Sequence, residues 1–242
     1  MDNIIEVKNL VKTFEELRAV DNISFAVRKG SIFAFLGPNG AGKTTTFYIL
    51  VGLARPDSGR VLLDGEDITD LPMYLRARSG ISYLPQEPSA FRQLTVEENL
   101  LAVLETLPLK AEQQRDRLEE LLAQMGLETV RHSRAYTLSG GERRRLEIAR
   151  SLVLNPAFIL LDEPFSGIDP LAVVDIQKII TDLSRARIGI LITDHNVPET
   201  LAVADRAYIL HSGRILCAGT PSELSTDAEV RRIYLGNNFR LN

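Results

Sequence analysis

One segment of the chain, residues 37–44, constrains the possible fold more than any other. Its sequence is GPNGAGKT, which matches the pattern G-x-x-x-x-G-K-[ST] at every fixed position. An apolar run of strand length, residues 31–36, precedes it, and a helix-like run, residues 45–50, follows it. In this order, backbone N–H groups form a concave anion site that faces the positive end of the helix dipole. The segment therefore predicts a phosphate-binding loop within an α/β fold.

Two side chains of this loop are suited to specific chemistry. Lys43 places a positive charge where the β- and γ-phosphates of a nucleotide bind, and the Thr44 hydroxyl is a suitable Mg²⁺ ligand. The glycines allow the backbone to take turns that a Cβ would block and to approach phosphate oxygens closely. The alternative is a chance match in a glycine-rich turn, which the flanking strand and helix patterns disfavour.

A second motif places two carboxylates, Asp162 and Glu163, at the end of an apolar run, residues 158–161. Unbroken apolar runs are typical of parallel strands that are covered on both faces. The carboxyl end of such a strand opens at the nucleotide site, so we expect Asp162 to hold Mg²⁺, directly or through water. We expect Glu163 to polarise the attacking water as a general base. The alternative is an acidic strand end that faces solvent.

A third motif, residues 138–142, is another glycine turn at the start of a helix, and it predicts a second anion site. One chain does not need two such sites for one triphosphate. A dimer does need two sites in each chain, if every nucleotide lies between the first site of one chain and the second site of the other. The sequence therefore predicts a head-to-tail homodimer.

The composition limits the classes of protein to consider. The 242 residues are 45% hydrophobic and carry a net charge of −4, so no global basic field favours nucleic acid as a partner. The apolar runs are far shorter than the roughly 18–20 residues of a membrane span, and the N-terminus shows no secretory signal. The single cysteine, Cys217, lies in an apolar run and is expected to be a buried, unreactive side chain in a reducing, cytosolic compartment.

The periodicity of the chain predicts a β-rich N-terminal third, a helical block over residues 88–155, and a return to α/β structure. The run 143–145, three arginines, is expected to form mostly a solvated helix face with a share of interface contact. Strands are predicted at 4–7, 23–27, 61–63, 81–84, 158–161 and 190–192, helices at 95–106, 111–125, 142–154, 173–185 and 222–234, and a hairpin over 207–217.

In this order and spacing, the motifs resemble those of the ATP-binding-cassette (ABC) ATPases over essentially the whole chain. The resemblance implies one ABC-type P-loop NTPase domain over residues 1–242, with a mostly parallel central sheet and an N-terminal antiparallel β subdomain. It also implies an inserted helical subdomain at about 88–155 and a C-terminal helix and tail at about 221–242. Two such chains would close around two MgATP, with residues 166–169 linking the two sites.

The resemblance also assigns roles to individual residues. Gln86 matches the glutamine that senses metal and water, and His195 the switch histidine that contacts the γ-phosphate. Phe14 lies where an aromatic ring stacks on adenine, although a tyrosine is commoner there and core packing is the alternative. The implied catalytic residues are Lys43, Glu163 and His195, the Mg²⁺ ligands are Thr44, Gln86 and Asp162, and the ATP-binding residues are Phe14, Gly37, Pro38, Asn39, Gly40, Ala41, Gly42, Lys43, Thr44, Thr45, Gln86, Ser139, Gly140, Gly141, Glu142 and Asp162.

Outside the shared motifs, the chain is most similar to the ATPase subunits of lipopolysaccharide-export ABC transporters. The segments that carry this similarity are 77–87, 89–92, 139–145, 162–165, 193–197 and 234–241.

That similarity implies two integral membrane permease subunits as partners and lipopolysaccharide as indirect cargo. It implies a peripheral location on the cytoplasmic face of the inner membrane, or a cytoplasmic one when unassembled. Phe91 and Arg92 are then expected to couple to a partner helix. The alternatives are the ATPase of a branched-chain amino-acid importer and a soluble ABC-type assembly ATPase.

Overall fold

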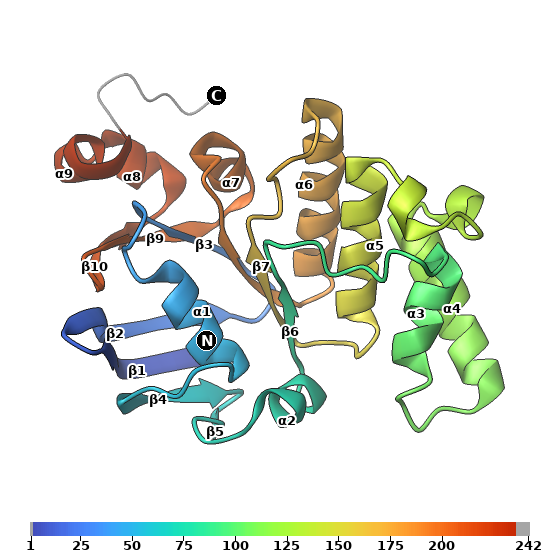
Figure 1. Cartoon of the computed structure of the whole chain (residues 1–242). Coiled ribbons are helices and arrows are strands. Elements are labelled where there is room, and N and C mark those ends of the chain that lie inside the picture. The colour runs from blue at the N-terminus through green and yellow to red at the C-terminus, as the bar shows by residue number, and fades with distance from the viewer. Residues whose placement is uncertain (1, 236–242) are drawn as a thin grey trace.

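Two β-sheets and the helices around them form the molecule (Figure 1). The computed structural model describes residues 2–235. The larger sheet has the strand order β10-β9-β3-β8-β7-β6, and the smaller sheet has the order β2-β1-β4-β5. The strands are β1 (Asn3–Phe14), β2 (Leu17–Arg28), β3 (Ile32–Leu36), β4 (Ser58–Leu63), β5 (Glu66–Asp67), β6 (Ile81–Leu84), β7 (Phe158–Asp162), β8 (Gly189–Thr193), β9 (Arg206–His211) and β10 (Arg214–Gly219).

The larger sheet is parallel from β9 to β6, and only the pairing of β10 with β9 is antiparallel. Every residue of β3, β7 and β8 is buried, which is why these strands appear in the sequence as unbroken apolar runs. Because the strands are parallel, their carboxyl ends meet at one edge of the sheet. Asp162 pairs in register with Thr193 at that edge, so the segments that follow β7 and β8 begin side by side.

The hydrophobic core lies on both faces of the larger sheet. Successive residues of a strand point to opposite faces, and β3 shows this directly. Phe33 and Phe35 belong to the cluster that the smaller sheet and helix α1 (Lys43–Val51) cover. Ile32, Ala34 and Leu36 belong to the cluster that packs against the helices of the other face. The phosphate-binding loop between β3 and α1 is thus held by packing on both sides.

The smaller sheet is built from longer strands than the sequence predicted. The expected strands at 4–7 and 23–27 are parts of β1 and β2, which have 12 residues each. Register shifts interrupt the β1–β2 pairing, and Asn9 and Asn22 adopt left-handed backbone conformations near them. These irregularities break the alternation of apolar and polar residues, so the pattern identified only the regular parts of the strands.

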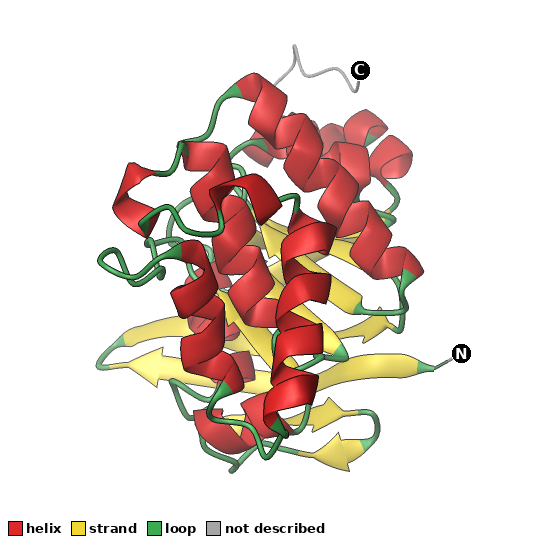
Figure 2. Ribbon diagram, turned by 90° about the vertical axis from the view of Figure 1, so that its right-hand side faces the viewer, coloured by secondary structure: helices red, strands yellow, loops and turns green. Residues whose placement is uncertain are grey.

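Three helices lie together at one end of the molecule, beside the larger sheet (Figures 1 and 2). Helix α3 (Val96–Leu104) begins at the predicted capping box, in which the Thr95 side chain accepts a hydrogen bond from the Glu98 N–H. Helix α4 (Ala111–Met125) has the predicted bounds and ends at Gly126. Helix α5 (Gly140–Leu152) begins two residues earlier than predicted. The treatment of residues 88–155 as a subdomain stays a prediction.

The other helices include elements that the sequence analysis did not identify. Helix α6 is Pro170–Arg185, with Asp169 as its N-cap, and α2 (Met73–Arg78) and α7 (Val197–Val203) were not predicted. No helix within residues 2–235 is long and apolar enough to span a bilayer.

The predicted last helix, 222–234, is not continuous. It is divided into α8 (Pro221–Thr226), α9 (Ala228–Val230) and a short π-helix (Arg231–Leu235). Asp227 takes an extended conformation between the first two, and its carboxylate caps α9 by accepting from the Glu229 and Val230 N–H groups. The tail beyond residue 235 lies outside the described residues.

Candidate nucleotide site

The phosphate-binding loop has the backbone that its glycines allow. Gly42 caps α1 with a φ of 98°, a conformation that other residues rarely adopt. A Cβ on Gly42 would also collide with the Ala19 carbonyl oxygen of β2. The Lys43 ammonium donates hydrogen bonds to the Gly37 and Pro38 carbonyl oxygens, at 2.7 and 3.0 Å. Burial lowers the pKa of Lys43, against the opposing effect of Glu163 and Asp162 nearby.

Glu163, directly after β7, has an unusual backbone conformation. Its φ is 49°, in the left-handed region where glutamate is rare, and its N–H donates to the Thr193 carbonyl oxygen at 2.7 Å. Such outliers cost free energy and occur preferentially at functional sites. This backbone hydrogen bond holds Glu163 against Thr193 at the end of β8. Asp194 and His195 are the next two residues of the chain.

Both carboxylate oxygens of Glu163 have partners from neighbouring strand ends. The Gln86 Nε2 atom donates to Oε2 at 2.8 Å, and His195 Nε2 lies 2.9 Å from Oε1. The Glu163 side chain is 12% exposed, whereas that of His195 is 56% exposed. Three side chains that lie up to 109 positions apart in the sequence therefore converge on one point at the edge of the larger sheet.

Asp162 is the more deeply buried carboxylate, at 5% exposure. Burial raises its pKa, while a hydrogen bond from Tyr83 and the positive charges of Arg144 and Lys43 act in the opposite direction. The Tyr83 hydroxyl donates to Asp162 Oδ2 at 3.1 Å. Burial and the adjacent carboxylate raise the pKa of Tyr83 well above its usual range, so this hydroxyl keeps its proton.

A cleft of about 360 Å³ brings most of the predicted site residues together. Phe14 lies at its mouth, 48% exposed, with the Lys12 ammonium 5.3 Å from the ring centroid. Gly37 and Pro38 contribute through their hydrogen bonds to Lys43 and are not part of the lining. The cleft is lined by Phe14, Leu17, Ala19, Asn39, Gly40, Ala41, Gly42, Lys43, Thr44, Thr45, Gln86, Asp162, Glu163, Thr193 and His195.

The second glycine turn is not part of this cleft. Ser139 is exposed and caps α5, and its Oγ atom donates to Glu142 Oε2 at 2.7 Å. The Glu142 carboxylate also accepts from the Ser139 N–H at 2.8 Å, and these two hydrogen bonds lower its pKa. Gly141 packs against α6, where a Cβ would lie 2.8 Å from that of Ala172. Within one chain, the predicted residues Ser139, Gly140, Gly141 and Glu142 thus lie outside the lining of the cleft that holds the other predicted residues.

The expectation that residues 143–145 form a solvated face is wrong for Arg144. Its side chain is 7% exposed and pairs with the buried carboxylate of Glu147 at 3.2 Å. The guanidinium also donates to the carbonyl oxygens of Asp162 and Glu163, at 3.0 and 2.8 Å, and to those of Pro85 and Pro164. Arg144 therefore ties the end of β7 to Pro85, which directly precedes Gln86, a role that a run of three arginines does not suggest.

Sequence analysis also missed two polar residues beside the carboxylates. Thr193 is 2% exposed, and its hydroxyl has no hydrogen-bond partner within residues 2–235. Asp194 accepts hydrogen bonds from the Phe165 and Asn196 N–H groups, at 2.9 and 2.8 Å, and so fixes the loops after β7 and β8. The only signal for either residue was its position between an apolar strand and His195.

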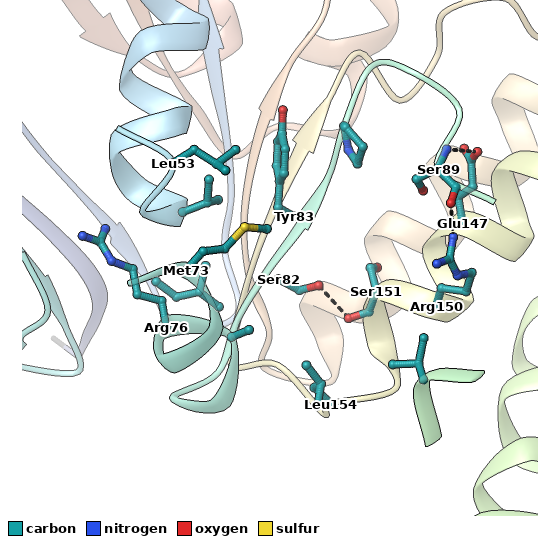
Figure 3. A pocket seen from close by; sticks show the side chains of 15 residues that line it. Leu53, Met73, Arg76, Ser82, Tyr83, Ser89, Glu147, Arg150, Ser151 and Leu154 are labelled. Atoms are coloured by element: carbon teal, nitrogen blue, oxygen red, sulfur yellow. Dashed lines mark hydrogen bonds between the residues drawn. The ribbon is translucent and has the colours of Figure 1, made fainter. Parts of the chain in front are cut away.

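A second hollow, a groove of about 400 Å³, lies between α2, β6 and α5 (Figure 3). Leu53 and Met73 line it on one side, and Glu147 and Arg150 on the other. The Arg150 guanidinium lies 4.4 Å from the ring centroid of Phe91, which is 49% exposed. The predicted coupling residue therefore lies beside this groove.

Comparisons with known proteins agree with this geometry. The family model described as "ABC transporter" matches residues 20–166. The chain is 53% identical to the "Lipopolysaccharide export system ATP-binding protein LptB" of Acidithiobacillus ferridurans, over 100% of both chains. It is also 53% identical to the protein of the same name from Escherichia coli (strain K12), over 98% of this chain and 99% of the other.

Solved structures show the same fold. The ADP conformation of an ATP-binding cassette of an ABC transporter superimposes with a TM-score of 0.88 at 30% identity, over 98% of this chain and all of the other. A dimeric bacterial ABC transporter cassette gives a TM-score of 0.79 at 27% identity, over 90% of this chain and 98% of the other. The predicted α/β fold of a P-loop NTPase is confirmed.

Proposed function

The chain belongs to the ABC transporter family of ATPases, and from this membership we propose that it is the ATP-hydrolysing subunit of a lipopolysaccharide-export transporter. The observation that carries the enzymatic part is the position of Glu163, held between Gln86 and His195 in the cleft of the phosphate-binding loop. The full-length identity of 53% to several lipopolysaccharide-export ATP-binding proteins supports the choice of cargo.

ATP binds in the cleft with its triphosphate along the loop of residues 37–44. Lys43, which donates to the Gly37 and Pro38 carbonyl oxygens, transfers these hydrogen bonds to phosphate oxygens when the nucleotide enters. Phe14, half exposed at the mouth of the cleft, stacks on the adenine ring. Such stacking contributes on the order of 1 kcal/mol.

The polar groups of the cleft fit a magnesium ion. Asp162 is a buried carboxylate whose pKa burial raises, so a nearby cation would relieve an unfavourable environment. Mg²⁺ binds through oxygen ligands, with one or two carboxylates supplemented by substrate phosphates. Thr44, Asp162 and the amide oxygen of Gln86 would hold it. When bound, it neutralises the charge that develops on the transferred phosphoryl group.

Glu163 acts as the general base on the attacking water. Its contacts with Gln86 and His195 must open or rearrange before a water molecule can take a place beside Oε1 or Oε2. His195, which is the more exposed partner, then becomes free to contact the γ-phosphate. The catalysis rests mainly on positioning and on charge neutralisation, as phosphoryl transfer requires.

Two chains close head to tail, so that each nucleotide lies between the phosphate-binding loop of one chain and the turn 139–142 of the other. The turn is exposed at Ser139 and is not part of the cleft of its own chain. The N-terminus of α5, which has 13 residues, presents its backbone N–H groups and dipole to an anion. The dimeric cassette at 27% identity supports the formation of a dimer.

We infer that, in the dimer, the groove beside Phe91 of each chain receives a helix from one of two integral membrane partners, and that the subunit therefore works at the cytoplasmic face of the inner membrane. The apolar side chains of Leu53 and Met73 on its wall suit an amphipathic helix. Phe91 is the anchor, because exposed aromatic side chains concentrate binding energy at interfaces. Arg92 follows it on the exposed segment.

Replacing Phe91 by Ala is expected to impair lipopolysaccharide transport more than the ATPase activity of the isolated subunit. The change removes an interface anchor worth about 2 kcal/mol but leaves the nucleotide cleft intact. Transport in reconstituted vesicles and ATPase activity in solution measure the two effects. Val174→Ala on α6, which removes another exposed apolar side chain, serves as the control. Equal loss of both activities, or loss of neither, contradicts the assignment.

Affinity purification of the Glu163→Gln variant from native membranes in MgATP tests the proposed function as a whole. We expect two distinct membrane proteins and lipopolysaccharide to be recovered with it. Recovery with importer permeases would be consistent with the ATPase mechanism but would show that lipopolysaccharide is not the cargo. Recovery of a wholly soluble dimer or of soluble partners would overturn the assignment to a transporter.

A further inference from the structure

One side chain, Tyr83, connects the groove to the nucleotide cleft. Its ring lines the groove between α2, β6 and α5. Its hydroxyl donates to Oδ2 of Asp162, a carboxylate that lines the nucleotide cleft. Figure 3 shows the ring standing along β6, with its hydroxyl directed away from the end of the groove where Leu154 lies.

The strand register explains this position. Tyr83 on β6 pairs with Leu160 on β7, two residues before Asp162. Ile81 and Tyr83 project to the face of the sheet that α1 covers, because alternate residues of a strand share a face. From there a tyrosine extends along β7 as far as its carboxyl end. A phenylalanine would fill the same place but would lack the oxygen that makes the hydrogen bond.

The hydrogen bond constrains the orientation of Asp162. The two oxygens of a carboxylate share one rigid plane, so holding Oδ2 limits the rotation of Oδ1 as well. Asp162 is 5% exposed, and few water molecules can replace a lost partner there. Side chains that hydrogen-bond to a metal ligand, without binding the metal themselves, contribute strongly to metal affinity.

On the side of the groove, the ring is bordered by side chains that are themselves partly exposed. Met73, which is 42% exposed, directs its side chain toward Tyr83, and Leu53 lies on the same side (Figure 3). Both residues line the open groove, so the packing around the ring depends on what occupies it. On the other side of the strand, Ser82 is fixed by a hydrogen bond to the Ser151 carbonyl oxygen at 2.7 Å.

We propose that Tyr83 is a positioning residue for Asp162. The side chains that line the groove beside the Tyr83 ring restrain this ring, and the restraint strengthens metal binding in the cleft. The inference rests on the proposed role of Asp162 as a Mg²⁺ ligand. It adds a physical connection between the groove and the metal site that passes through a single side chain.

The test compares nucleotide affinity with and without metal, using Mn²⁺ as the probe and a non-hydrolysable ATP analogue. For the full-length wild-type chain, affinity in saturating Mn²⁺ is divided by affinity in EDTA to give the gain due to metal. Tyr83→Phe is expected to reduce this gain about 10-fold while leaving the affinity in EDTA unchanged. Tyr74→Phe, the same chemical change at an exposed position on α2, is expected to leave both values unchanged.

A second pair of variants tests the connection to the groove. Met73→Ala removes the side chain that points toward the ring and is expected to reduce the metal gain in the same direction, but by less. Leu154→Ala truncates a side chain that lines the same groove at its other end, and it is expected to leave the gain unchanged.

The outcomes separate this inference from the proposed function. Absence of any metal gain in the wild-type chain would overturn the magnesium site itself. A wild-type gain that Tyr83→Phe retains in full, or that Tyr74→Phe reduces equally, would overturn the role of Tyr83. A loss with Tyr83→Phe but equal effects of Met73→Ala and Leu154→Ala would overturn the connection to the groove.

Discussion

Replacing Glu163 by Gln is expected to lower the ATP turnover number by about 10²–10⁴-fold. The amide keeps the size of the side chain and its ability to contact Gln86 and His195, which now lie 2.8 and 2.9 Å from the carboxylate oxygens. It cannot accept the proton of the attacking water. The effect is measured as steady-state phosphate release at saturating MgATP, and ATP binding is measured separately.

We expect ATP affinity to remain near that of the wild type, because the loop around Lys43 is unaltered. Glu105→Gln, at an exposed position after α3, provides a matched control and should turn over normally. A Glu163→Gln variant that hydrolysed ATP at the wild-type rate would show that another group activates the water.

Replacing Arg144 by Met is expected to lower the free energy of unfolding by about 3–5 kcal/mol. The change leaves the Glu147 carboxylate, whose side chain is 3% exposed, without its cationic partner in the core. It also leaves the carbonyl oxygens of Asp162 and Glu163 without their donor. Denaturant-induced unfolding of the isolated chain measures the effect.

Two comparisons identify burial as the cause. Arg185→Met breaks an ion pair with Asp182 that has the same i, i+3 spacing but is exposed, and it should cost less than about 1 kcal/mol. The double variant Arg144→Met with Glu147→Leu removes the uncompensated charge and should recover part of the lost stability. Equal destabilisation by Arg144→Met and Arg185→Met would contradict this explanation.

The sequence predicted the nucleotide cleft well because its parts follow local rules. Residues 37–44 form a contiguous motif, and Asp162 and Glu163 end an apolar run that the structure shows as the buried strand β7. The roles of these residues stay predictions, but the structure brings residues 39–45 of the loop and both carboxylates into one cleft. For the groove beside the helices, the sequence analysis named only Phe91 and Arg92 as coupling residues, since the walls of the groove come from α2, β6 and α5, which are distant in the sequence.

The errors have a common physical origin. Arg144 was read with its neighbours as a solvated face, whereas the structure shows it buried, because burial depends on which elements pack together. Cys217 was expected to be buried and is only half-buried, since β10 is an edge strand of the larger sheet. The last helix was predicted as continuous, but the Asp227 side chain makes a local cap that competes with helical hydrogen bonding.

The sequence by itself determined the phosphate-binding loop, the two carboxylates after β7 and the family resemblance, because each is a short pattern of residue types. Only the tertiary structure decided which distant side chains meet. The contact of Glu163 with Gln86 and His195, and that of Tyr83 with Asp162, depends on strands β6, β7 and β8 lying side by side in parallel. Strand order is set by the packing of the whole sheet against its helices, and no local pattern encodes it.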